Sequence, residues 1–286
     1  MSAPDPRTTP YRPDLAASHL RNIVQAPQYV DGMAYQVIET TAPLRREPRP
    51  DAPLDTEGLL GERVIVYEHD AEGWAWGQLE RDGYVGFLPL SALIPAAGAS
   101  THKVTALRTL GFPGPDIKLP PAMALPFGAR VEVLADHGSR SGTLAATAGG
   151  YFVPTRHLAP LKRREIDFVA VAERFLGAPY LWGGKTSLGI DCSGLVQVSL
   201  QATGAVCPRD SDMQERALGE QIPPTGFHRG DLIFWRGHVA IVRDTTTIIH
   251  ANAFHMAVAI EPIAEAVARI AAGGSEVTSV KRIARR

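Results

Sequence analysis

The stretch Asp191-Cys192-Ser193-Gly194 decides how this chain is interpreted, because it places a cysteine at the predicted start of a helix. The helical spacing is carried by four positions: Cys192, Leu195, Val196 and Ser199. Thiolate is the reactive form of cysteine, and a helix N-terminus lowers the pKa of a thiol through its dipole. The stretch therefore predicts Cys192 as a nucleophile, against the plainer alternative that a lone cysteine is a small buried apolar residue.

Two histidines follow at distances that suit a base and its orienting partner. His238 lies 46 residues after Cys192 (238 − 192) in an apolar strand, and His250 lies 12 residues later (250 − 238), as a neighbouring antiparallel strand requires. A histidine can accept the thiol proton when a third polar group orients its ring. His250 is one candidate orienter and Asn252, on the same strand face, is its rival. Each histidine also has a plainer interpretation as a hydrogen-bonded core residue.

A zinc site built from Cys192, His238 and His250 is the alternative use of the same side chains. No closely spaced pair of cysteines or histidines supports it, as structural zinc sites usually require. We therefore expect no metal and no cofactor.

Residues 162–286 alternate between helical and strand patterns. Helices are predicted where Ile166, Val169, Ala172, Phe175 and Leu176 share one face, and again over 261–271. Strands are predicted over 230–235, 238–242, 245–249 and 277–283. A helix that carries a thiol and packs on an antiparallel sheet gives an α+β fold.

The first half of the chain contains an internal repeat. Residues 61–66 resemble 128–133, and residues 83–87 resemble 150–154, both at a shift of 67 residues (128 − 61 and 150 − 83). We infer two small tandem β-barrels, 35–96 and 101–160, behind an N-terminal arm over 1–34. Both barrels resemble bacterial SH3-like domains.

Five strings in the last domain occur in a family-specific order: Pro179-Tyr180-Leu181-Trp182-Gly183-Gly184, Asp191-Cys192-Ser193-Gly194, Arg209-Asp210-Ser211-Asp212-Met213-Gln214, Gly230-Asp231-Leu232-Ile233-Phe234 and Gly237-His238-Val239-Ala240-Ile241. Together they resemble the NlpC-type cell-wall cysteine peptidases, a papain-like α+β family, over nearly all of 165–286. The resemblance implies Cys192 as nucleophile, His238 as base and His250 as orienter. It also implies that the hydroxyl of Tyr180 and the N–H of Cys192 polarise the scissile carbonyl.

Family members with SH3-like domains ahead of the peptidase cleave γ-D-glutamyl–diaminopimelate bonds and require a free N-terminal L-alanine. The resemblance therefore implies a murein peptide such as L-Ala-γ-D-Glu-diaminopimelate as substrate, and a site for its ammonium group. We expect the substrate-binding residues to be Asp191, Ser193, Asp210 and Ser211. Asp191 is also a good helix N-cap, and Ser211 could be an ordinary loop or helix-cap serine; these are the structural alternatives.

The first barrel supplies two further candidates. The resemblance implies that Glu62 and Tyr84 lie beside the active site, where Glu62 would close the amine end of its groove. In the repeat, Tyr84 aligns with Tyr151, so a structural role is open, whereas Glu62 aligns with Ala129. The alternative for Glu62 is a solvated surface charge.

The whole composition excludes some classes of function. Lys plus Arg (29) nearly balances Asp plus Glu (30), so we expect no nucleic-acid or membrane partner. Two cysteines are too few for a disulfide scaffold. The first ten residues contain no apolar stretch, so we expect a cytoplasmic enzyme that recycles wall peptides. Oligomeric state is left open.

Three other functions compete with this hypothesis. The same chemistry in a broader endopeptidase would act on intact wall. A non-catalytic wall-binding protein would use the SH3-like domains alone. An acyl transferase would pass the thioester to an amine instead of water.

Overall fold

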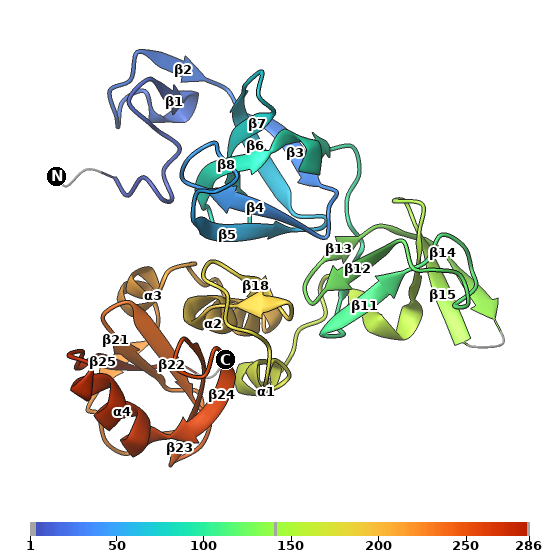
Figure 1. Ribbon diagram of the computed structural model, residues 1–286. Helices are drawn as coiled ribbons and strands as arrows, with labels where there is room; N and C mark the ends of the chain where they lie inside the picture. The colour runs from blue at the N-terminus through green and yellow to red at the C-terminus, as the bar shows by residue number, and fades with distance from the viewer. Residues whose placement is uncertain (1–3, 140–141, 285–286) are drawn as a thin grey trace. The chain divides into compact units, whose positions relative to one another are not determined.

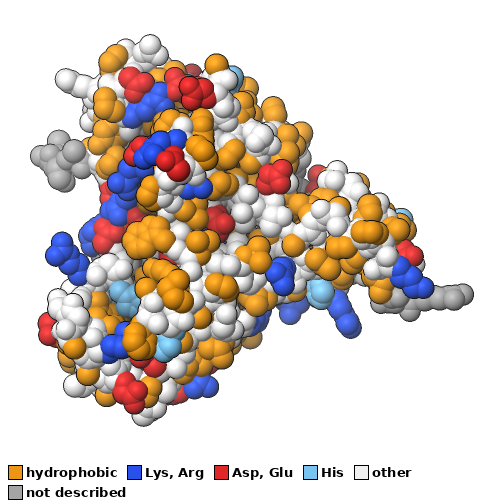
Figure 2. Space-filling model, viewed as in Figure 1, with side chains coloured by type: hydrophobic (Ala, Val, Ile, Leu, Met, Phe, Trp, Pro, Cys, Tyr) orange, Lys and Arg blue, Asp and Glu red, His pale blue; other side chains and the backbone are white. Residues whose placement is uncertain are grey.

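The computed structural model describes residues 4–139 and 142–284 and divides the chain into two compact units, Met1–Arg163 and Arg164–Arg286 (Figure 1). The division falls within the basic run Lys162-Arg163-Arg164. On the face drawn in Figure 2, acidic and basic side chains are interspersed, in line with a net charge of −1. Within the described ranges, the helices are too short or too polar to cross a bilayer.

The N-terminal arm packs on the first sheet of unit 1. It contains β1 (Leu15–Ala17), η1 (Ser18–Leu20) and β2 (Gln28–Val30), with β1 and β2 parallel. Leu15 is buried together with Trp76 and Val85, and the Arg12 guanidinium lies 4.8 Å from the Trp76 ring centroid. The arm is therefore part of the folded unit, held by apolar burial and a cation–π contact.

The first barrel region is a seven-stranded sheet in the order β5-β4-β8-β7-β6-β3-β9. Its strands, with a short 3₁₀ turn η2 (Leu90–Ala92), are β3 (Met33–Val37), β4 (Thr41–Arg45), β5 (Leu54–Leu59), β6 (Arg63–His69), β7 (Trp74–Leu79), β8 (Val85–Pro89) and β9 (Leu93–Pro95). Alternating strand residues such as Val64, Leu79 and Leu88 fill its core.

The second barrel region is built from shorter pieces. Its strands, with the turn η3 (Thr155–His157), are β10 (His102–Val104), β11 (Arg108–Gly111), β12 (Met123–Pro126), β13 (Arg130–Val131), β14 (Val133–Ser139), β15 (Gly142–Thr147), β16 (Phe152–Pro154) and β17 (Leu158–Pro160). They form the small sheets β13-β10-β17, β11-β12 and β14-β15-β16. Val104, Leu125 and Val153 are buried between them.

Glycines mark the same turns in both barrel regions. Gly61 and Gly128 have φ of 78° and 85°, and Gly83 and Gly150 have φ of 76° and 80°. These left-handed angles favour glycine and recur at the 67-residue shift seen in the sequence. At Gly61 a side chain is also excluded, because a Cβ would lie 2.1 Å from the carbonyl oxygen of Arg130.

Unit 2 is a six-stranded antiparallel sheet in the order β20-β25-β21-β22-β23-β24, with helices around it. The sheet strands are β20 (Glu220–Ile222), β21 (Leu232–Trp235), β22 (His238–Val242), β23 (Thr247–Asn252), β24 (Ala257–Pro262) and β25 (Val277–Arg282). A small hairpin, β18 (Lys185–Thr186) and β19 (Gly189–Ile190), precedes α2. The helices are α1 (Phe168–Glu173), α2 (Cys192–Ala202), α3 (Ser211–Ala217) and α4 (Ile263–Ala272). The predicted α+β architecture is confirmed.

Two predicted helices differ from those observed. Helix α1 begins only at Phe168, because the Asp167 carboxylate accepts the Val169 N–H at 2.9 Å and caps the helix there. Ile166 is consequently fully exposed instead of sharing an apolar face. The helix predicted over 261–271 begins two residues later, at Ile263, and Glu261 belongs to β24. This second difference matters for the site.

Candidate active site

Cys192 is the first residue of α2, and the helix is set in place by the residue before it. The Asp191 carboxylate accepts the Gly194 N–H at 2.7 Å, which is an N-cap. All residues of α2 except Gln201 are buried, so the helix is embedded in the unit. Cys192 is only 7% exposed, and the N–H of Val239 at the start of β22 donates to its sulfur.

Burial dominates the acidity of this thiol. Desolvation, with a further contribution from the Asp191 carboxylate, raises the pKa of Cys192 to about 12. The backbone N–H groups of Val239 and Ser193, which lower this pKa, are outweighed. The resting thiol is therefore neutral at neutral pH, opposite to the effect expected from the helix dipole alone. Attack by Cys192 requires a base that removes the proton during the reaction.

His238 and His250 are joined ring to ring. Nε2 of His238, the first residue of β22, lies 2.8 Å from Nδ1 of His250 on β23. Asn252, the rival orienter, is turned elsewhere, because its Oδ1 accepts from the backbone N–H of His255 at 2.8 Å and lies 3.0 Å from the His255 ring Nδ1. The geometry gives His250 the orienting contact. It also makes the two rings a donor–acceptor pair, which is not how two ligands of a shared zinc ion face each other.

Glu261 extends this pair, a role that was not predicted from the sequence. His250 Nε2 lies 2.6 Å from Glu261 Oε1 on β24, and the Arg269 guanidinium on α4 also bonds to this carboxylate. One sequence feature pointed to its position: Glu261 precedes Pro262, and a residue before proline avoids helical angles. In the extended conformation of β24, Glu261 reaches the buried His250 instead of beginning the helix.

The chain of contacts fixes where the protons lie. Burial alone would raise the pKa of Glu261, but the His250 bond and the Arg269 charge lower it below the usual range, so the group is an acceptor. His250 must then carry its proton on Nε2 and accept the Nε2–H of His238 on Nδ1. The remaining lone pair of His238 is on Nδ1. Burial, assisted by His250 and Arg269, lowers the pKa of His238 to about 3, so this imidazole is neutral.

Tyr180 lies within the electrostatic reach of the nucleophile. Burial, followed by the Cys192 and Asp191 charges, raises the pKa of Tyr180 to about 12, so its hydroxyl keeps its proton. The Tyr180 N–H donates to the Met256 carbonyl at 2.9 Å, and Tyr180 bridges to Ile190, two residues before the nucleophile. Its oxyanion role stays a prediction, and a protonated hydroxyl beside the thiol is what that role needs.

Asp191 is engaged by the protein's own donors. Arg209, which is 1% exposed, donates to both carboxylate oxygens at 2.9 and 2.7 Å. The Gly183 N–H donates to Oδ2 at 2.8 Å in addition to the helix-capping bond from Gly194. The acceptor positions of the carboxylate are filled, so the structure favours the capping interpretation of Asp191 over ammonium binding. This role of Arg209 was not predicted from the sequence.

The other substrate-binding candidates of unit 2 lie around the same arginine. The Ser193 hydroxyl accepts from Arg209 at 2.9 Å and lies 3.3 Å from Asp191 Oδ1. Asp210 precedes α3 without capping it through its side chain, and Ser211 is the first residue of α3. Gln214 of α3 donates to the Ser193 carbonyl at 2.9 Å, which holds the start of α3 against the start of α2. Their contact with substrate stays a prediction.

Glu62 and Tyr84 are buried inside unit 1. Glu62 is 1% exposed, accepts the Leu59 N–H at 2.9 Å and pairs with Arg81 at 2.9 Å. The alternative of a solvated surface charge is therefore wrong. Tyr84 belongs to the core of the first barrel region, and Tyr151 packs similarly in the second. Their role in the amine pocket stays a prediction.

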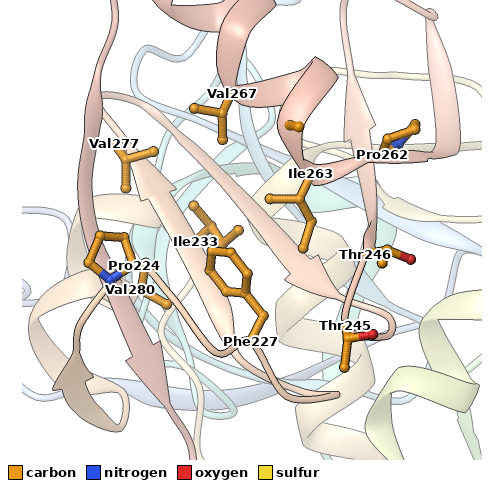
Figure 3. A pocket seen from close by; sticks show the side chains of 11 residues that line it. Pro224, Phe227, Ile233, Thr245, Thr246, Pro262, Ile263, Val267, Val277 and Val280 are labelled. Carbon is orange, nitrogen blue, oxygen red and sulfur yellow. The ribbon is translucent and has the colours of Figure 1, made fainter.

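The predicted catalytic residues do not line the apolar cavity of unit 2. This pocket of about 550 Å³ lies between α4 and the sheet, and its lining includes Phe227, Ile233 and Val267 (Figure 3). None of its lining residues is among the predicted catalytic residues. Cys192 and His238 are instead the first residues of α2 and β22, and His250 lies within the neighbouring strand β23.

Two parts of the chain match known families. Residues 177–270 match the NlpC/P60 family, and residues 44–93 match the bacterial dipeptidyl-peptidase SH3 domain. Dipeptidyl-peptidase 6 of Lysinibacillus sphaericus is 38% identical over 86 residues, covering 30% of this chain and 32% of that protein. The γ-D-glutamyl-L-lysine dipeptidyl-peptidase of Bacillus subtilis (strain 168) is 34% identical over 105 residues, covering 32% and 35%. The match thus spans about a third of the length of these two curated relatives.

A solved structure shares the fold. An NlpC/P60 family protein from Bacillus cereus ATCC 10987 superimposes with a TM-score of 0.72 at 20% sequence identity, over 87% of this chain and 99% of that one. At this identity the likeness concerns the fold alone. It agrees with the α+β unit and the strand-rich region before it.

Proposed function

Because the carboxy-terminal unit belongs to the NlpC/P60 family of cysteine peptidases and a bacterial dipeptidyl-peptidase SH3 domain precedes it, we propose that this chain is a cysteine peptidase of murein peptides. Its finer activity is hydrolysis of the γ-D-glutamyl–diaminopimelate bond in short peptides with a free N-terminal L-alanine. One observation carries the proposal. The contacts from His238 to His250 and on to Glu261 leave an unprotonated nitrogen on His238, and the N–H of the next residue, Val239, donates to the Cys192 sulfur.

The reaction proceeds in two halves. As the Cys192 sulfur attacks the scissile carbonyl carbon, its proton moves to His238 Nδ1. The negative oxygen of the tetrahedral intermediate accepts hydrogen bonds from the Tyr180 hydroxyl and the Cys192 N–H. The imidazolium then gives its proton to the leaving amine, and a thioester remains. Water, deprotonated by the same nitrogen, attacks the thioester and releases the glutamyl product and the thiol.

The names of the two relatives support the class of bond and leave the third residue of the peptide open. One relative is named for γ-D-glutamyl-L-lysine, whereas the SH3-like architecture led us to expect diaminopimelate. The activity on L-Ala-γ-D-Glu-diaminopimelate should therefore be compared with the activity on the corresponding lysine tripeptide. The N-acetylated form of each peptide tests whether a free amine is required.

The deciding experiment incubates the purified full chain with these peptides and detects the products by mass spectrometry. We expect release of the diamino acid from the free-amine peptides only. Equal cleavage of the N-acetylated forms would refute the amine requirement, and digestion of intact sacculi would favour a broader endopeptidase. Cys192→Ala should abolish turnover, whereas Cys207→Ala, at the other buried thiol, should retain it. Activity in Cys192→Ala would refute the nucleophile.

A further inference from the structure

A third histidine lies beside the linked side chains of His238, His250 and Glu261 and has no part in the proposed reaction. His255 is exposed, in the turn between β23 and β24. One ligand atom from each of His250, His255 and Glu261 can be chosen so that all three lie within 4.8 Å of one another. Two of these residues orient the base, and the third gives the group an approach from solvent.

The donor set is one that transition metals prefer. Two imidazoles and a carboxylate bind Zn²⁺ in tetrahedral sites that keep a fourth position for water. Glu261 has its second oxygen as well as Oε1, which bonds to His250. A small opening of this 2.6 Å contact would admit an ion between the two groups.

In both histidines, the ring nitrogen that would not bind the metal already contacts another polar side chain. His255 Nδ1 lies 3.0 Å from Asn252 Oδ1, and His250 Nδ1 lies 2.8 Å from His238 Nε2. Histidines that bind metals usually hold their other ring N–H on an acceptor, because this contact fixes the tautomer and the ring orientation. His255 therefore has the outer contact of a metal ligand, and His250 gains it once its proton lies on Nδ1 and His238 Nε2 accepts it.

We propose that His250, His255 and Glu261 form a reversible site for a divalent cation of the Zn²⁺ type, and that its occupation switches off the base. Binding itself needs only these side chains, whereas the switch rests on the proposed peptidase function. The cation takes the place of the proton between His250 Nε2 and Glu261. His250 then carries its proton on Nδ1, received from His238 Nε2.

The proton balance shows why the base is lost. The proton displaced from His250 Nε2 passes through solvent to His238 Nδ1, so each imidazole still holds one proton and none is gained or lost. His238 now has its lone pair on Nε2, where it accepts from His250. The nitrogen that would receive the Cys192 proton is occupied.

Arg269 limits the affinity of this site. Its guanidinium pairs with Glu261 and would be displaced from that oxygen, but it also lies 4.3 Å from the ring centroid of Phe254 in the same turn. The second contact gives Arg269 an alternative position without losing its cation–π partner. Removing the arginine should therefore tighten metal binding, because a competing positive charge is gone.

Binding is tested without the thiol, which is itself a zinc ligand. Full-length Cys192→Ala is titrated with Zn²⁺ by calorimetry beside Cys192→Ala/His255→Ala. We expect one ion per chain in the first protein and affinity weaker by at least about ten-fold in the second. Cys192→Ala/Arg269→Met should bind several-fold more tightly than Cys192→Ala. Equal affinity with and without His255, or no binding to Cys192→Ala, would overturn the site.

The switch is tested with the thiol present. His255→Ala in a chelator should retain the activity of the unsubstituted chain, and Zn²⁺ should inhibit it only at concentrations at least about ten-fold higher. Unchanged inhibition in His255→Ala would overturn the switch, because the ion would then act at Cys192. If the chain shows no peptidase activity on any of the peptides, the proposed function fails, while the calorimetric result still decides the site.

Discussion

Two buried carboxylates of the peptidase unit, Asp191 and Glu261, each pair with an arginine, yet their surroundings differ. Asp191 also accepts two backbone N–H groups, and its partner Arg209 is 1% exposed. Glu261 accepts from one histidine, and the side chain of its partner Arg269 is 27% exposed. The first pair is joined to the backbone around the nucleophile, and the second to a side chain that orients the base.

This difference in surroundings predicts that one carboxylate supports folding and the other supports the reaction. Asp191 determines where α2 begins and hence where Cys192 lies, so its loss should appear mainly in stability. Glu261 determines which nitrogen of His250 carries a proton, so its loss should appear mainly in the rate. A carboxylate–arginine pair has no fixed meaning by itself, since the other donors around it decide its role.

The largest effect is expected from Asp191→Ala. It removes a helix cap and leaves the Arg209 charge buried without its carboxylate, which costs about 3–5 kcal/mol of unfolding free energy. Amide hydrogen exchange of α2 in the full chain measures this loss. Glu165→Ala is the matched control, because its pair with Arg174 is exposed and should contribute only about 0–1 kcal/mol. Equal protection of α2 in both variants would contradict the comparison.

Glu261→Gln is expected to act on the rate. Glutamine has almost the same shape, but its amide can donate to His250 Nε2 and so favour the wrong tautomer. We expect kcat to fall about 10–100-fold, equivalent to roughly 1.4–2.7 kcal/mol, with KM nearly unchanged. Steady-state kinetics on the tripeptide measures it.

Glu265→Gln is the control for this change, because it alters an exposed glutamate in the first turn of α4. It should leave kcat within about two-fold, since exposed substitutions away from special features have small effects. A normal kcat in Glu261→Gln would show that His250 keeps its tautomer without the carboxylate. A parallel loss in α2 protection would show that Glu261 acts through folding.

The sequence predicted the helix start, the two histidines and the α+β architecture because each depends on local spacing. Glu261 was assigned to a helix, since Glu and Ala favour helices and the pattern continues through Arg269. Pro262 favours an extended residue before it, and this bias outweighs the helical pattern at Glu261. Arg209 was given no role because arginine is rarely fully buried, and only the folded unit shows that Asp191 neutralises it.

A third carboxylate–arginine pair, Glu62 with Arg81 in unit 1, extends the comparison, and its expected effect on stability is smaller. The aligned position in the repeat is Ala129, so this barrel type folds without the carboxylate. Glu62→Gln keeps an acceptor for the Leu59 N–H and loses the ion pair, so we expect a loss of about 1 kcal/mol. Hydrogen exchange at Leu59 measures it. Loss of protection throughout unit 1 would contradict a local role.

The smallest effect is expected from Arg269→Met, the counterpart of Arg209 on the other side of the site. Because Arg269 is partly exposed, its ion pair should contribute about 0–1 kcal/mol to stability. Glu261 still accepts from His250 without it, so kcat should fall by no more than about five-fold, a barrier change of roughly 1 kcal/mol. Unfolding and kinetics on the same preparation measure both quantities. A stability loss as large as that of Asp191→Ala would show that the two pairs are equivalent and that solvent exposure does not distinguish them.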